Sequence, residues 1–419
     1  MDRLSKSKLK EIATEFPIYY DEIKIKQIIE KTDATQIEKL NKDELKLFVN
    51  QLYCLNTFGS ISDIELFLTD NCNLRCSYCF VKKKRSKNMS FNTAKKAINF
   101  LVYYSGNTDK LHITFFGGEP LLQIDTITKI LKYCEKVEKY TTKKFDFALT
   151  TNGSLVSEEI MKVLSPKMLI LLSIDGDKET HDKYRKDQKG KGTFEKIIDK
   201  IGLIKSSQGW LGTRMTVMPS EIHKLFNNVE YLYSLGINQF IIAPSFGAIW
   251  NKDNLVLYEQ EFIKLTRLYK SKIENKEPFR ITFFEKDENS LEKLSGSWGC
   301  RAGRHSMAID TQGDIYPCSK FIGLERYNCP EYYLGNLDEG LINIQARKNL
   351  TMMNASNYPE CQNCNDISSC TGGCPAENFN INRSIFIPCK EQCEITKIQN
   401  RVLRKFWAEQ ELIKEEVVE

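Results

Sequence analysis

Two patterns of hydrophobic and polar positions alternate along the chain from about residue 61. Short, continuous apolar runs are separated by segments in which apolar residues recur every three or four positions. The continuous runs predict buried strands, and the periodic segments predict helices that bury one face. The expected strands are 64–69, 111–116, 145–150, 169–174, 213–218 and 239–244, and the expected helices lie near 92–105, 125–140, 157–164, 193–207 and 222–235.

Buried strands that alternate with helices predict an α/β fold, in which a parallel sheet is covered by helices. A closed barrel of about eight strands would need two more units, so we expect a partial (β/α)6 barrel over residues 61–250. Polar or glycine-rich sequence follows several of these strands. Parallel α/β folds bind their ligands at the carboxyl ends of the strands, so we expect the functional site there.

The other segments lack the alternating strand and helix patterns of the predicted barrel. Residues 1–60 are lysine-rich and mostly helical in pattern, which fits either a peptide-docking module or a helical cap. Residues 251–295 predict a bridging helix and a short strand, and residues 396–419 predict a C-terminal helix. Between them, residues 296–395 are rich in glycine, cysteine and short turns. Such a region buries little continuous core, so we expect bound metal clusters to cross-link it.

Charge and hydropathy exclude two classes of partner. The 60 basic and 55 acidic residues leave a net charge of +5, which is too small to indicate nucleic-acid binding. The sequence has no apolar run long enough to span a membrane, and its first residues lack the apolar core of a signal peptide. We therefore expect a cytoplasmic protein. In that reducing compartment, the 14 cysteines favour metal binding over disulfides.

The first cysteine group follows the first predicted strand, in the sequence CNLRCSYCF. Cys72, Cys76 and Cys79 are separated by three and then two residues. Three thiolates can hold three irons of a four-iron, four-sulfur cluster and leave the fourth iron open to a ligand. Zinc is the alternative, but a structural zinc site usually has two CxxC pairs or histidines nearby. The group therefore favours an iron–sulfur cluster with one open position.

Together with Tyr78 and Phe80, this CxxxCxxC motif resembles the radical S-adenosylmethionine (SAM) family. The resemblance implies that SAM binds the open iron, that one electron cleaves it to a 5′-deoxyadenosyl radical, and that this radical abstracts a hydrogen atom from the substrate. It also implies that the GGEP sequence binds the amino group of SAM. The residues implied in cofactor binding are Tyr78, Phe80, Gly117, Gly118, Glu119, Pro120, Asn152, Ser173, Asp175 and Arg185.

The C-terminal cysteines resemble the SPASM domain of radical SAM enzymes that modify peptides. The resemblance implies two auxiliary four-iron clusters, and hence three 4Fe-4S clusters in all. The implied ligands of the first are Cys300, Cys318 and Cys374, with Cys329, Cys389 or no protein ligand at its fourth iron. Those of the second are Cys361, Cys364, Cys370 and a late cysteine, for which we prefer Cys393 to Cys389.

Two enzyme functions fit these resemblances. The first is a maturase that forms a thioether or other crosslink in a ribosomally made precursor peptide. The second is an anaerobic sulfatase maturase that makes formylglycine. Sulfatase maturases carry an aspartate after the cysteine that corresponds to Cys318, and here Ser319 stands there. Either enzyme needs a one-electron donor such as a flavodoxin or ferredoxin. A ferredoxin-like carrier is a third possibility, but a carrier needs no SAM-binding motifs. The sequence assigns no catalytic acid or base.

Overall fold

The structure is a computed structural model. It describes residues 37–82, 84–164, 168–285, 300–324, 330–351, 353, 358–367, 370 and 372–416, with side chains described as far as residue 409. One proposed ligand, Cys329, lies outside the described residues.

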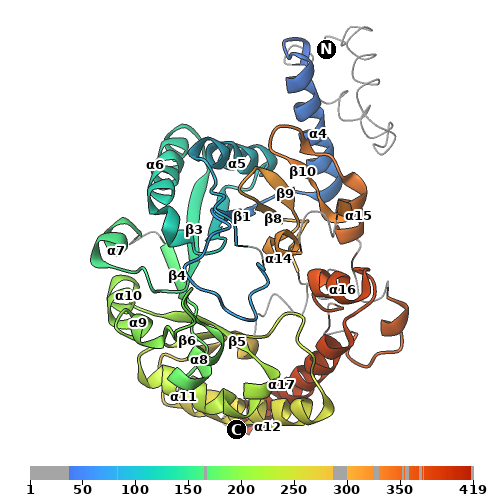
Figure 1. The fold of residues 1–419 in the computed structure, drawn as a ribbon. Coiled ribbons are helices and arrows are strands. Elements are labelled where there is room, and N and C mark those ends of the chain that lie inside the picture. Colours follow the sequence, from blue (N-terminus) through green and yellow to red (C-terminus); the bar gives the residue numbers. More distant parts are fainter. Residues whose placement is uncertain are drawn as a thin grey trace.

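Six parallel strands in chain order form the centre of the molecule. Each pairs in parallel with the next, which confirms the predicted partial barrel (Figure 1). The strands are β1 (Asp63–Phe67), β2 (Lys110–Phe116), β3 (Lys144–Thr151), β4 (Met168–Leu172), β5 (Gly212–Val217) and β6 (Gln239–Pro244).

The strands bury one face more completely than the other. In β2, Leu111, Ile113 and Phe115 are buried, whereas the alternate residues are exposed or half-buried. Because successive side chains of a strand point to opposite faces, the buried set packs against the helices and the alternate set lines the inside of the barrel. The polar residues on that inner face are therefore placed for function.

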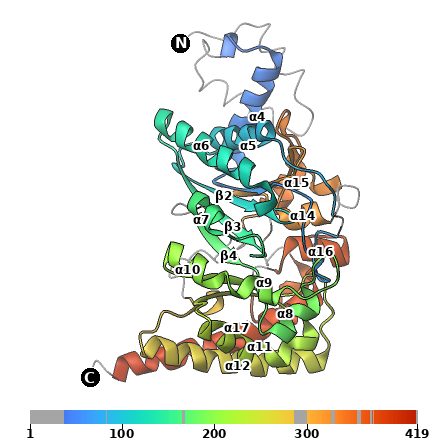
Figure 2. The same cartoon turned by 60° about the vertical axis from the view of Figure 1, so that its left-hand side comes forward.

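Helices cover the outer face of the sheet in both views (Figures 1 and 2). The expected helix at 193–207 is divided in two, α9 and α10, which end and begin around Asp199 and Lys200. The helices of the barrel are α5 (Phe91–Tyr104), α6 (Ile124–Tyr140), α7 (Glu158–Leu164), α8 (Lys178–Tyr184), α9 (Phe194–Ile198), α10 (Ile201–Gln208) and α11 (Leu225–Ser234).

The cysteine-rich region continues the barrel sheet. Its first strand, β8 (Ser306–Ile309), pairs in parallel with β1. Antiparallel strands β9 (Asp314–Tyr316), β10 (Gly335–Asn336) and β11 (Gly340–Leu341) extend the sheet beyond β8. At the other edge, β7 (Arg280–Ile281) adds to β6. The shared sheet fixes this region beside β1. Its short helices are α14 (Ser319–Gly323), α15 (Ile344–Thr351) and α16 (Pro375–Asn382).

Helix α4 (Lys42–Phe58) lies against the edge strand β11. The side chain of Asn50 donates a hydrogen bond to the carbonyl of Leu341 at 2.8 Å, and the amide of Leu341 donates back to Asn50 at 3.2 Å. These bonds satisfy polar groups of the edge strand that would otherwise remain open to pairing. Because α4 also contacts α5 of the barrel, it connects the cysteine-rich region to the barrel.

Two long helices, α12 (Lys252–Glu274) and α17 (Lys390–Glu416), pack side by side at the end of the molecule opposite α4 (Figures 1 and 2). Helix α17 begins six residues before the expected start at 396, so Cys393 lies in its first turn. Within the described part of the chain, no helix is long and apolar enough to cross a membrane.

Candidate functional site

The loops that follow β1 and β2 are joined by backbone hydrogen bonds. The amide of Gly118 donates to the carbonyl of Thr69 at 2.7 Å, and the amide of Glu119 donates to the carbonyl of Asn71 at 2.9 Å. Gly117 has a φ of 132°, a conformation that side-chain-bearing residues rarely adopt. The GGEP sequence is therefore held directly against the cysteine loop that begins at Cys72.

Glu119 is a buried carboxylate, 1% exposed. It accepts hydrogen bonds from the hydroxyl of Thr151 at 2.7 Å and from the amides of Asn152 and Leu121 at 2.9 and 3.1 Å. Burial raises the pKa of Glu119, although these three bonds oppose the shift. No ion pair joins it to any described residue, so its negative charge is uncompensated. An ammonium group, such as that of SAM, suits this position.

Cys72, the first cysteine of this loop, lies beside Glu119. Burial raises the pKa of the Cys72 thiol, and the charge of Glu119 raises it further. Burial also raises the pKa of Cys76 to about 11. The ammonium of Lys84 lies 3.1 Å from the sulfur of Cys79. Buried thiolates need positive charge nearby, which iron would supply.

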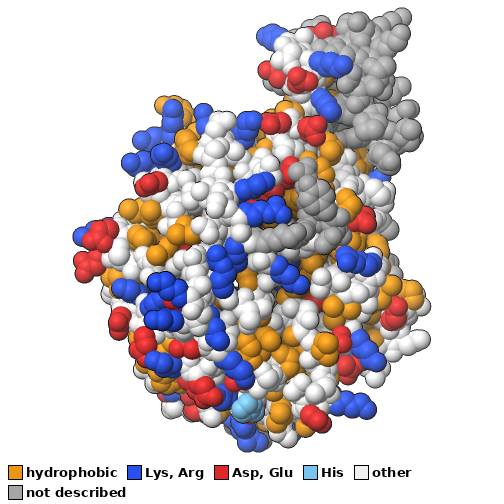
Figure 3. All heavy atoms as spheres, in the orientation of Figure 1, with side chains coloured by type: hydrophobic (Ala, Val, Ile, Leu, Met, Phe, Trp, Pro, Cys, Tyr) orange, Lys and Arg blue, Asp and Glu red, His pale blue; other side chains and the backbone are white. Residues whose placement is uncertain are grey.

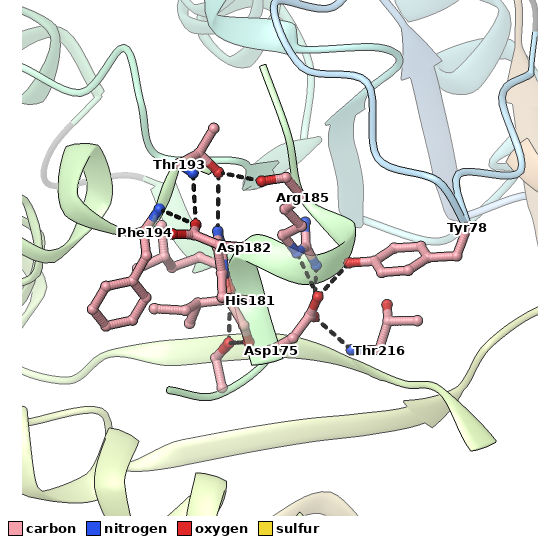
Figure 4. A network of polar contacts seen from close by, with 11 residues as sticks. Tyr78, Asp175, His181, Asp182, Arg185, Thr193, Phe194 and Thr216 are labelled. Atoms are coloured by element: carbon pink, nitrogen blue, oxygen red, sulfur yellow. Dashed lines mark hydrogen bonds and ion pairs between the residues drawn. The ribbon is translucent and has the colours of Figure 1, made fainter. Parts of the chain in front are cut away.

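Asp175 and Arg185 form a buried ion pair beside this loop (Figure 4). Arg185 donates through Nε at 2.8 Å and through a terminal nitrogen at 2.9 Å, one bond to each carboxylate oxygen. Asp175 also accepts from the hydroxyl of Tyr78 and, at 2.9 Å, from the amide of Thr216. Burial alone would raise the pKa of Asp175, but the charge and hydrogen bonds of Arg185 hold it below its ordinary value. The pair fixes Tyr78 of the cysteine loop to β5.

A second layer of hydrogen bonds holds the Arg185 backbone (Figure 4). Thr193 donates its hydroxyl proton to the Arg185 carbonyl at 2.9 Å, and that hydroxyl lies 3.1 Å from Nε2 of His181. Asp182 accepts from the amides of Thr193 and Phe194 at 2.7 and 2.8 Å. Burial, with Arg185 nearby, lowers the pKa of His181 to about 4. His181 is therefore neutral at neutral pH and acts as a structural hydrogen-bonding group.

The remaining predicted cofactor residues lie at the same ends of the strands. The amide of Ser173, which follows β4, donates to the carbonyl of Thr151 at 2.8 Å. The side chain of Asn152 donates to Asn73 of the cysteine loop at 2.9 Å. Pro120 begins a short 3₁₀ helix that follows Glu119. The structure thus brings the residues after β1, β2, β3 and β4 together at the carboxyl ends of these strands.

An aromatic surface extends from the cysteine loop. Phe80 stacks on Phe116 of β2 with ring centroids 6.0 Å apart, and its edge meets Phe246, which follows β6, at 6.5 Å. The ammonium of Lys320 lies 4.8 Å from the Phe246 ring and 3.7 Å from the sulfur of Cys374. The sequence motifs identified only Phe80. Phe116, Phe246 and Lys320 carry no motif, and only the fold brings them together.

The later cysteines form two groups. In the first, burial raises the pKa of Cys318, and its neighbours Glu65, Cys374 and Cys300 add to the shift. In the second, one cavity is lined by four thiols, those of Cys361, Cys364, Cys370 and Cys393.

Cys389 does not line the cavity of this second group. It is buried, and its thiol donates to Glu391 at 3.3 Å. Burial raises its pKa to about 11, and the acidic groups of Glu391 and Glu377 add to the effect. Its amide donates to Asn378 at 2.8 Å. Cys389 therefore has partners of its own, apart from the four thiols of the cavity.

The donor sets suit iron–sulfur clusters better than single metal ions. Among the described residues, no three His, Cys, Asp or Glu side chains meet closely enough to share one ion. A tetrahedral zinc ion requires such convergence, whereas a four-iron cluster places each thiolate on a separate iron. Each of the three groups consists of cysteines, the softest protein ligands.

Comparison with known proteins assigns the chain to a family. The profile of the radical SAM superfamily matches residues 66–229, and that of the SPASM iron–sulfur cluster-binding domain matches residues 300–365. An uncharacterized protein of Methanocaldococcus jannaschii is 34% identical over 65% of this chain and 88% of its own length. This chain belongs to the radical SAM superfamily and carries a SPASM domain. The radical SAM protein is therefore an enzyme that uses SAM and iron–sulfur clusters.

Two named relatives indicate the kind of enzyme to which this chain belongs. The radical SAM cyclopropyl synthase TigE of Paramaledivibacter caminithermalis is 25% identical over 96% of this chain and 88% of its own. A cysteine-type anaerobic sulfatase-maturating enzyme of Clostridium novyi is 27% identical over 73% of this chain and 85% of its own. The chain is thus of the peptide- or sulfatase-maturase kind.

Solved structures share the fold of this radical SAM enzyme. The enzyme anSMEcpe with bound AdoMet (SAM) and a Cp18Cys peptide aligns with a TM-score of 0.66 at 20% identity, over 82% of this chain and 99% of that one. Streptococcus suis SuiB bound to its precursor peptide SuiA aligns with a TM-score of 0.57 at 16% identity, over 88% of both chains. At these identities, the alignments establish the fold alone.

Basic side chains surround the cysteine loop of the enzyme, the loop that carries Cys72, Cys76 and Cys79 and that we call the cluster loop. Lysine and arginine side chains gather near the centre and along one side of the face shown in Figure 3. The cluster loop pairs with the loop after α8, since the amide of Arg75 donates to the carbonyl of Lys186 at 2.7 Å. The exposed basic residues of these two loops and of the run after Phe80 are Arg75, Lys82, Arg85, Lys87, Lys186, Lys189 and Lys191.

Proposed function

We propose that this radical SAM enzyme modifies a ribosomally made precursor peptide, abstracting a hydrogen atom from one residue and forming a thioether or other crosslink. The main support is the arrangement of its two cysteine-bearing regions around one barrel interior. The carboxylate of Glu65, on β1, accepts from the amide of Ser319 at 2.8 Å, and so holds the Cys318 loop against the barrel. Cluster loop and Cys318 loop then flank the same space.

When bound, SAM and its cluster would supply the 5′-deoxyadenosyl radical, and the auxiliary clusters would accept an electron from the substrate. The chain itself binds and orients. Glu119 holds the ammonium of SAM, and the pair of Asp175 and Arg185 fixes the cluster loop. Phe80 and Phe116 exclude water from the space beside the loop, which protects a reactive radical.

We assign three clusters to the cysteines. Cys72, Cys76 and Cys79 hold the cluster that binds SAM. The first auxiliary cluster takes Cys300, Cys318 and Cys374, with its fourth ligand still to be assigned. The second takes the four thiols of the single cavity, which favours Cys393 over Cys389 as its last ligand. The assignment is supported by the all-thiol composition of each group.

Substituting Cys393 and Cys389 separately by alanine should distinguish these two thiols. Cys393→Ala is expected to lower the iron content by the equivalent of one cluster, because it removes one ligand of the cavity. Cys389→Ala is the matched control, and it should keep all the iron of the wild type. Iron and sulfide analysis after anaerobic reconstitution gives the result, with electron paramagnetic resonance to identify the cluster that is lost. Loss of iron only in the Cys389 variant would reverse the assignment.

The proposed activity is tested in two steps. Reconstituted enzyme with dithionite and SAM should form 5′-deoxyadenosine, and absence of this product would refute radical chemistry. The enzyme is then incubated with the short peptides encoded beside its own gene, and the products are analysed by mass spectrometry. A crosslink should remove two hydrogen atoms and, where a cysteine takes part, abolish thiol alkylation. A peptide that returns unchanged from every such reaction would contradict the proposal.

Formylglycine formation is the second candidate. Ser319 replaces the aspartate that sulfatase maturases carry at this position, and this difference weakens the case for formylglycine formation. Yet Glu65 places another carboxylate at the amide of Ser319, so the site does not lack an acid. The two candidates differ in product, because formylglycine is an aldehyde and a crosslink is not. A sulfatase-derived peptide that became reactive towards a hydrazide would establish the second candidate.

The relatives support a peptide as the substrate in either case. Solved structures of SuiB and of anSMEcpe contain bound peptides. A relative that aligns over nearly the whole chain is a cyclopropyl synthase, which supports radical-driven bond formation. The basic side chains around the cluster loop suit an acidic one-electron donor of the flavodoxin or ferredoxin type, because opposite charges steer association.

A further inference from the structure

Two charged residues stand between buried neighbours in the barrel strands β1 and β5. Glu65 stands in β1 between buried Ile64 and Leu66, and Arg214 stands in β5 between buried Thr213 and Met215. Because successive side chains alternate between faces, the buried neighbours pack outwards and the two charges point inwards. Neither residue belongs to the motifs that hold SAM.

Arg214 is solvent-exposed and yet enclosed by protein. Its side chain is accessible to solvent, whereas the protein around it lowers its pKa, an effect that Glu65 partly opposes. Both statements fit a side chain on the inner face of the barrel, whose open inside we call the chamber. β1 and β5 are separated by three strands in the sheet, so only the curvature of the barrel brings Glu65 and Arg214 within electrostatic reach.

The side chain of Arg214 has no hydrogen bond or ion pair to any residue that the structure describes. Among the described residues, Glu65 is the acidic group that opposes the lowering of its pKa, and Glu65 already accepts from the amide of Ser319. A guanidinium presents five donors in a rigid fork that matches a carboxylate. Left without partners in an enclosed chamber, it attracts an anionic group strongly.

The position of Arg214 separates it from the expected SAM site. The SAM-type residues follow the ends of β2, β3 and β4, whereas Arg214 is the third residue of β5. It lies two residues before Thr216, whose amide bonds to Asp175. Arg214 therefore lies next to the SAM network without belonging to it, on the inner face that also carries Glu65.

We propose that Arg214 determines substrate specificity by binding a carboxylate of the substrate peptide, on an acidic residue close to the one from which hydrogen is abstracted. The inference rests on the proposed peptide-modifying function. The aromatic surface of Phe80, Phe116 and Phe246 supplies the apolar part of the chamber, and Arg214 supplies the charged contact. Such a division is typical of binding sites, in which a few polar groups orient a ligand on apolar walls.

Binding of two synthetic peptide mixtures to the SAM-loaded holoenzyme tests this role. Both contain short, capped, fluorescently labelled peptides with randomised flanks, and they differ in a central glutamate or glutamine. Wild-type enzyme should bind the glutamate mixture about tenfold more tightly, as expected for a charge-assisted hydrogen bond. Arg214→Gln should bind both mixtures alike, and Arg214→Lys should keep part of the preference. Arg401→Gln, on the surface of α17, is the control and should behave as wild type.

Two further measurements distinguish a wrong role for Arg214 from a loss of SAM binding or of radical chemistry. SAM affinity and peptide-free formation of 5′-deoxyadenosine should be unchanged in Arg214→Gln. Weakened SAM binding in this variant would place Arg214 in the cofactor site and overturn the proposal. Equal binding of the two mixtures by the wild type, or no binding of either, would also overturn it. Because 5′-deoxyadenosine is measured without peptide, loss of radical chemistry is recognised separately.

Discussion

Replacing Gly118 with alanine is expected to slow 5′-deoxyadenosine formation by at least about a hundredfold, because small misplacements of reacting groups cost this much. A Cβ atom at Gly118 would lie 2.0 Å from the carbonyl oxygen of Asn71 and 2.5 Å from its carbon. These are backbone atoms of the cluster loop, so no side-chain rotation relieves the contact. The loops after β1 and β2 must separate, which moves Glu119 away from Cys72.

Gly202 provides the matched control for this substitution. It lies in helix α10, and a Cβ atom there would meet nothing within 4 Å. Gly202→Ala should therefore leave activity unchanged and stabilise the helix by about 0.5–1 kcal/mol. Iron content, SAM affinity and the rate of 5′-deoxyadenosine formation are measured for both variants. A Gly118→Ala enzyme with wild-type rate and SAM affinity would show that the two loops need not touch.

The sequence patterns predicted the barrel well because its strands are buried and regularly spaced. All six expected strands are present in parallel order, and each agrees with its predicted range to within a few residues. The local signal is strong here, since the helix-facing side of each strand is almost entirely apolar. The pairing of β8 with β1 was not predicted, because it joins residues more than 200 positions apart and leaves no periodicity in the sequence.

In the candidate site, the sequence singles out only residues that belong to local motifs. Glu119 and Asp175 occur in short polar sequences after strands, and the structure places both beside the cysteine loop. Glu65 and Arg214 were missed, although each is a charge inside an apolar run. That signal was present, but a charge in a predicted strand indicates an inner-facing position only once the curvature of the sheet is known. Likewise, only the folded structure shows that Cys393 lines the four-thiol cavity and that Cys389 does not.

Removing the charge of Asp175 is expected to destabilise the enzyme by about 3–5 kcal/mol, the cost of leaving one partner of a buried ion pair alone. The side chains of Asp175 and Arg185 are only 1% and 8% exposed. Asp175→Asn keeps the shape but leaves the guanidinium without its counter-charge. The double variant with Arg185→Met should recover much of the loss, because the unpaired charge is then gone. Denaturant midpoints of the reconstituted proteins measure the effect.

The exposed pair of Arg401 and Glu259 gives the comparison. Its side chains are 56% and 33% exposed, so Arg401→Gln should cost about 0–1 kcal/mol.

The pH dependence of stability offers an independent check on the role of Asp175. Arg185 holds the pKa of Asp175 below its unfolded value, so the contribution of Asp175 is present above that value and is lost as pH falls through the folded pKa. The difference between wild type and Asp175→Asn should therefore be largest near neutral pH and shrink in acid. A constant difference would mean that the aspartate charge is not what stabilises the network around Tyr78.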